Sequence, residues 1–106
     1  MKVEKWNAAD DGPLSEAAMR EKLESLGYRV SRYVYPPGTY FGPHIHDLDK
    51  IDAVISGHFR ISMGSDSAIL EAGDFVRVPR GAEHSAEVVS FDPVVSLDAV
   101  RVPKRD

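Results

Sequence analysis

The chain has 106 residues, of which 42% are hydrophobic, and a formal net charge of −4. This size fits one domain with a single small core, and the absence of cysteine excludes disulfides and thiolate metal ligands. The sequence has no long basic cluster and no apolar stretch of membrane-spanning length, so we expect no nucleic acid or membrane partner and a cytoplasmic location.

A short helical segment is predicted ahead of the first strand. Residues 10–13 (Asp-Asp-Gly-Pro) offer helix caps and a proline suited to a first helical turn, and Gly27 suits the position just after the last turn. We expect residues 1–27 to form a leader and a helix that lies across the remaining domain or contacts a second subunit. The apolar positions with helical spacing are Leu14, Ala17, Ala18, Leu23 and Leu26.

From Tyr28 onward, side chains alternate with period two and turn residues become frequent, which predicts a β domain over residues 28–102. Residues 103–106 are expected to form a frayed tail. Short strands at this regular spacing indicate an all-β antiparallel sandwich or barrel. The expected strands cover residues 28–35, 51–56, 58–63, 67–70, 75–78, 84–89 and 94–102.

Three of the four histidines have the spacing of a metal site. His44 and His46 are two residues apart on a segment expected to be extended, so their side chains should share one face. His84 would come from another strand. Because neutral imidazole is a common ligand for transition metals, the sequence predicts one divalent ion on three nitrogens, with iron, zinc, nickel, manganese and copper all open.

The residues around these histidines resemble the two motifs of the cupin superfamily, in particular its small single-domain members. The resemblance covers about residues 30–99 and implies a single jelly-roll barrel with a metal or ligand site in its mouth. The matching positions of the first motif are Gly38, His44, His46 and Gly57. Those of the second motif are Gly73, Pro79, Gly81 and His84.

Two positions depart from the family pattern. Lys50 stands where the family has a glutamate ligand, and Val88 stands where it has an asparagine. A protonated lysine has no lone pair, so it cannot replace the glutamate as a ligand.

Three interpretations of Lys50 remain open: it extends to the rim and pairs with Asp47, Asp49 or Asp52; it points inward and binds an anionic substrate; or it is a neutral amine that acts as base, nucleophile or ligand. Of the three aspartates, only Asp52 has the strand parity of His44 and His46, and it is expected to lie deep. We also expect Tyr40 to place a hydroxyl near the mouth as a substrate contact.

The first functional hypothesis is a metal-dependent enzyme, of dioxygenase or isomerase type, acting on a small molecule in the barrel mouth; no catalytic residue is assigned. The alternative is a non-catalytic ligand-binding or sensing protein in which Lys50 anchors an anionic ligand. A third hypothesis is a structural dimer with a vestigial pocket. We expect a homodimer because small β barrels with exposed edge strands readily bury those edges against a second copy.

Overall fold

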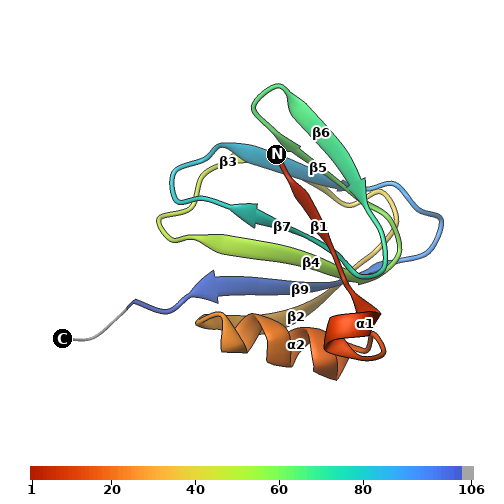
Figure 1. Cartoon of the computed structure of the whole chain (residues 1–106). Helices are drawn as coiled ribbons and strands as arrows, with labels where there is room; N and C mark the ends of the chain where they lie inside the picture. Colours follow the sequence, from red (N-terminus) through yellow and green to blue (C-terminus); the bar gives the residue numbers. More distant parts are fainter. Residues whose placement is uncertain (104–106) are drawn as a thin grey trace.

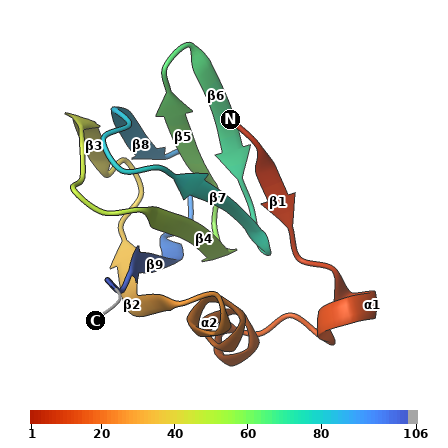
Figure 2. The ribbon, with the colours of Figure 1, turned by 60° about the vertical axis from the view of Figure 1, so that its left-hand side comes forward.

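Two antiparallel sheets face each other in the computed structural model, which describes residues 1–103 (Figures 1 and 2). The five-stranded sheet has the order β1 (Val3–Lys5), β7 (Asp74–Val78), β4 (Lys50–Ser56), β9 (Val94–Arg101) and β2 (Tyr28–Tyr35). The four-stranded sheet has the order β3 (Tyr40–His44), β8 (His84–Val88), β5 (Phe59–Met63) and β6 (Asp66–Leu70). The predicted all-β jelly roll is confirmed.

Two short helices, α1 (Ala8–Asp11) and α2 (Glu16–Ser25), replace the one expected helix. The expected caps in residues 10–13 were wrong, because these residues end α1 and connect it to α2. The side chain of Asn7 caps α1, and the Ser15 hydroxyl accepts a hydrogen bond from the Ala18 N–H at the start of α2. Gly27 does follow the last turn of α2, with a left-handed φ of 93°.

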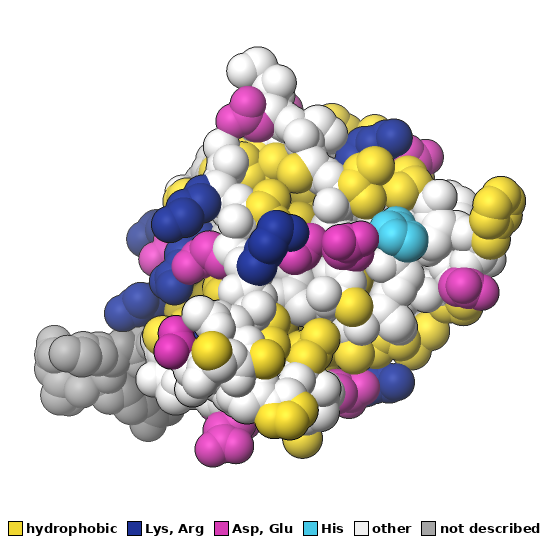
Figure 3. Space-filling view, turned by 45° about the vertical axis from the view of Figure 1, so that its right-hand side comes forward, with side chains coloured by type: hydrophobic (Ala, Val, Ile, Leu, Met, Phe, Trp, Pro, Cys, Tyr) yellow, Lys and Arg dark blue, Asp and Glu magenta, His cyan; other side chains and the backbone are white. Residues whose placement is uncertain are grey.

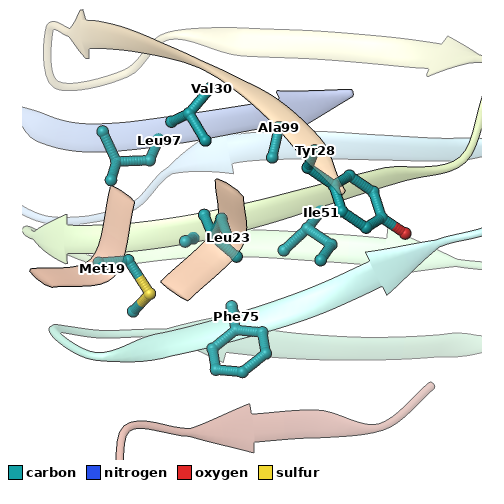
Figure 4. Close-up of a cluster of buried hydrophobic side chains, with 9 residues drawn as sticks. Met19, Leu23, Tyr28, Val30, Ile51, Phe75, Leu97 and Ala99 are labelled. Carbon is teal, nitrogen blue, oxygen red and sulfur yellow. The ribbon is translucent and has the colours of Figure 1, made fainter. Parts of the chain in front are cut away.

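Helix α2 packs across the outer face of the five-stranded sheet (Figure 4). Met19 and Leu23 of α2 are fully buried, and both belong to one hydrophobic cluster with side chains of β2, β4, β7 and β9. The helix therefore covers a barrel face, as one of the two sequence-based alternatives predicted. The sheet residues of this cluster are Tyr28, Val30, Ile51, Ala53, Phe75, Leu97 and Ala99.

Two strands were missed in the sequence. β1 has only three residues and depends on pairing with β7 through Val3 and Val76. β3 contains Gly42 and Pro43, which do not favour a strand, yet it pairs with β8 across an irregular register. His58 precedes β5 rather than beginning it. The remaining strands begin and end within one or two residues of the expected bounds, and residues 104–106 of the expected tail lie outside the described residues.

The molecular surface mixes charges of both signs. The face shown in Figure 3 carries acidic and basic side chains next to one another, with hydrophobic side chains between them. Several of the surface charges form ion pairs, such as Arg77 with Glu4 at 2.8 Å. Within residues 1–103, no helix combines the length and the apolar character needed to cross a membrane.

Candidate metal centre

The structure brings the three motif histidines together at one end of the space between the sheets. His44 ends β3 and is the direct cross-strand partner of His84, which begins β8. His46 lies two residues beyond the end of β3, so strand alternation explains its direction only in part. One ring nitrogen of each histidine lies within 4.8 Å of those of the other two. Residues far apart in the sequence thus form one three-nitrogen cluster.

Backbone carbonyls set the orientation of two of the rings. His44 Nδ1 lies 2.6 Å from the Gly42 carbonyl oxygen, and His84 Nδ1 lies 3.0 Å from that of Ala82. Because a carbonyl oxygen can only accept, each Nδ1 carries a proton, and in the neutral ring Nε2 is then the nitrogen with the free lone pair. Metal-binding histidines commonly have this arrangement, in which the second ring nitrogen donates to a carbonyl.

The third ring also has a free nitrogen. His46 Nε2 is buried and has no hydrogen-bond partner. Burial, together with Lys50, His44 and His84, lowers the pKa of His46, and burial likewise lowers the pKa of His84. These two imidazoles are therefore neutral at pH 7, the form that binds a metal.

The three imidazoles fit a divalent transition metal. In a tetrahedral site, two nitrogens bound to one zinc ion at about 2.1 Å lie about 3.4 Å apart. The three ring nitrogens, which lie within 4.8 Å of one another, would therefore have to draw closer together to bind an ion. Neutral imidazoles suit zinc, iron, nickel and copper, so the donor set does not choose among them.

A cavity of about 160 Å³ lies beside the histidines, which is smaller than the roughly 300–1,000 Å³ of pockets for drug-sized ligands and therefore suits only a very small molecule. One part of its wall is largely apolar and includes aromatic rings, whereas another carries charged and hydroxyl groups. The first part consists of Tyr35, Phe41, Phe59 and Ala86. The polar part consists of Lys50, Asp52, Ser96 and Asp98.

Lys50 points into this cavity and is only 8% exposed. Its Nζ lies 2.8 Å from Asp98 Oδ1 and 4.0 Å from Asp52 Oδ1. The interpretation that Lys50 extends to the rim and pairs with an aspartate is confirmed for the ion pair with Asp52, but Lys50 is buried rather than exposed and its nearer partner is Asp98. Asp49 has a different role, accepting a hydrogen bond from the Arg80 N–H at 2.8 Å. The role of Lys50 as an anchor for an anionic ligand stays a prediction, and the carboxylates beside it already balance its charge.

Asp98 is the site residue that the sequence interpretation missed. It lies in β9 between the buried residues Leu97 and Ala99, and it is the direct cross-strand partner of Asp52. An acidic residue between two apolar residues near the middle of a strand was the available signal. The expected inward direction of Asp52 is confirmed. Burial first, and then neighbouring Asp98, raise the pKa of Asp52 to about 6, against the opposing effect of Lys50.

Two other residues from the sequence interpretation lie away from the cluster. Tyr40 is 61% exposed, lies opposite Glu87 on β8, and is not among the residues that line the cavity. Its role as a substrate contact stays a prediction. Tyr35 lines the cavity instead, and burial raises the pKa of its phenol. His58, the fourth histidine, is exposed, and its Nε2 lies 3.7 Å from Glu71 Oε2.

Two curated relatives of unknown activity match the chain. The uncharacterized protein SCO3923 of Streptomyces coelicolor is 30% identical over 90 residues, which cover 85% of this chain and 81% of that protein. The uncharacterized protein y4oW of Sinorhizobium fredii is 36% identical over 58 residues. That match covers 55% of this chain and 27% of y4oW, so this chain accounts for about a quarter of that relative.

Solved structures and a family model agree on the fold. A chain from the crystal structures of the DMSP lyases RdDddP and RnDddQII has a TM-score of 0.64 and 26% sequence identity to this chain. The match covers 71% of this chain and 38% of that chain. The family model for the cupin domain matches residues 31–100. This range includes both histidine motifs and all four residues in the polar part of the cavity wall. The chain belongs to the cupin domain family.

Proposed function

We propose that the protein is a metal-dependent enzyme that binds one divalent transition metal through His44, His46 and His84 and acts on a small molecule in the adjacent cavity. The observation that carries this proposal is the convergence of three ring nitrogens, two of which are left free by hydrogen bonds from Nδ1 to backbone carbonyls. The relationship to a lyase structure extends the expected reaction types from dioxygenase and isomerase chemistry to lyase chemistry.

The residues around the histidines would perform distinct tasks. A bound metal would supply Lewis-acid or oxygen-activating chemistry, and three neutral imidazoles would leave its charge uncompensated. The aromatic rings of Tyr35, Phe41 and Phe59 would hold the apolar part of a substrate and limit the access of water. The polar part of the cavity wall would orient the polar groups of the substrate. The homodimer and the cytoplasmic location stay predictions, which sedimentation and cell fractionation can test.

Metal analysis tests the proposal. Protein purified without an affinity tag and reconstituted with each candidate ion should retain about one ion per chain by elemental analysis. His44→Ala and His46→Ala should lose most of that ion, because each removes one of three ligands. His58→Ala is the matched control, since this exposed histidine lies outside the cluster and should leave the metal content unchanged. Equal metal in His46→Ala and wild type would overturn the proposal.

A further inference from the structure

Two unsatisfied polar atoms lie in the same site. Among the side chains of residues 1–103, the buried polar atoms without a hydrogen-bond partner are His46 Nε2 and Asp98 Oδ1. Buried polar groups are nearly always hydrogen-bonded, so each exception calls for an explanation. A bound metal would explain why His46 Nε2 has no hydrogen-bond partner. It would not explain the same observation for Asp98 Oδ1, which calls for a separate partner.

Lys50 satisfies Asp98 only in part. Its Nζ lies 2.8 Å from Asp98 Oδ1, yet the two groups are not aligned as a hydrogen bond. The contact supplies charge compensation, and a carboxylate oxygen keeps lone pairs that can accept from another donor. A carboxylate paired with an ammonium accepts hydrogen bonds and does not donate them. A further partner must therefore offer an O–H or N–H group. Within the site, a side-chain hydrogen bond with Asp98 contributes to the raised pKa of Asp52, so the protonated Asp52 carboxyl can donate to one Asp98 oxygen, while the remaining lone pairs are left for a ligand.

The residues that carry the unsatisfied atoms line two hollows. His46, Lys50 and Asp98 line the 160 Å³ cavity, and they also line a second hollow of about 300 Å³ together with Asp47, Leu48 and Val100. These three side chains thus separate the inner cavity from an outer hollow. A molecule in the inner cavity can contact the histidine cluster and Asp98 at the same time.

We propose that Asp98 accepts a hydrogen bond from the hydroxyl or amine of a small ligand whose metal-binding group lies beside His46. The ligand class is a small molecule that carries this donor next to a carboxylate or carbonyl, such as a 2-hydroxy acid. Lys50 is a positioning residue that holds the Asp98 carboxylate in place. This inference rests on the proposed metal site.

Cobalt-loaded protein provides a test that does not depend on activity. Glycolate and methoxyacetate both offer a carboxylate and a neighbouring oxygen, but only glycolate has an O–H to donate. Their dissociation constants can be measured from changes in the cobalt absorption bands. Wild type should bind glycolate about tenfold more tightly than methoxyacetate, the ratio that corresponds to about 1.4 kcal/mol.

Asp98→Asn keeps the side-chain size but removes the charged acceptor, so the preference should fall several-fold while cobalt stays bound. Asp92→Asn is the control, the same substitution at an exposed position that does not line the cavity, and should keep the preference. An unchanged preference in Asp98→Asn would overturn the role of Asp98 alone. Failure of wild type to bind cobalt, or any other candidate ion, would instead overturn the proposed function.

A second measurement needs no variant that might fail to fold. In zinc-loaded wild type labelled with ¹³C at the aspartate carboxyls, glycolate should shift the resonance of a buried carboxyl. Methoxyacetate should leave that resonance in place, because it has no proton to donate. Equal effects of the two compounds would contradict the inference.

Discussion

The two faces of β4 are both buried, but only the face toward the other sheet carries charged side chains. Ile51 and Ala53 face helix α2 and are fully buried in an apolar cluster. Lys50 and Asp52, on the other face, line the cavity with Asp98 of neighbouring β9. Burial of apolar area stabilises the fold, whereas burial of charges costs free energy even when they are paired. Val54, on the same face as Lys50 and Asp52, is fully buried in the apolar cluster between the two sheets. The helix-facing surface therefore serves stability alone, whereas the inner face combines a stabilising apolar part with a charged part beside the cavity.

The largest effect should come from breaking the charge balance of the inner face. Lys50→Met leaves Asp98 and Asp52 buried without their cation, and we expect a loss of about 3–5 kcal/mol in the free energy of unfolding. Urea unfolding followed by circular dichroism would measure it.

The control for this variant removes the closer of the two ion pairs. Lys50→Met combined with Asp98→Leu should recover part of the lost stability, because only Asp52, the more distant carboxylate, then lacks its cation. A double variant as unstable as Lys50→Met would show that lost packing, rather than an unpaired carboxylate, causes the effect.

On the other face, Leu23→Ala should cost about 3 kcal/mol, because it removes a fully buried side chain between α2 and the sheet and leaves a cavity. Leu26→Ala is the matched control at the end of the same helix, where the side chain is 38% exposed, and should cost far less. Metal content should stay unchanged in both variants. Loss of metal in Leu23→Ala would contradict the division between the two faces.

The smallest effect concerns the pH dependence of Asp52. Its pKa is raised to about 6 in the folded protein, against about 3.9 in an unfolded chain. The protonated Asp52 carboxyl therefore contributes its full stabilisation of the fold below about pH 4, and this contribution is lost as the pH rises through about 6. Over this range the free energy of unfolding should fall by at most about 1.4 kcal/mol per pH unit. Asp52→Asn should lack this slope in unfolding measurements across that range. Parallel curves for the two proteins would contradict the assignment.

Much of the site could be predicted from the sequence because its signals are local. His44 and His46 are neighbours in the chain, and His84 lies in a motif of its own. Asp98 belongs to no such motif, and it meets Lys50 only through the pairing of β4 with β9. Strand parity could show that Lys50 and Asp52 share a face, but it could not show which strand lies beside them.

The sequence by itself determined the all-β fold and the three-histidine pattern, because strand alternation and the ligand chemistry of imidazole are written in neighbouring residues. Only the tertiary structure decided the partner of Lys50, the short strands β1 and β3, and the unsatisfied oxygen of Asp98. Each of these depends on which strands pair and in what register. Pairing register is set by long-range packing of the two sheets and α2, which no single segment of the chain encodes.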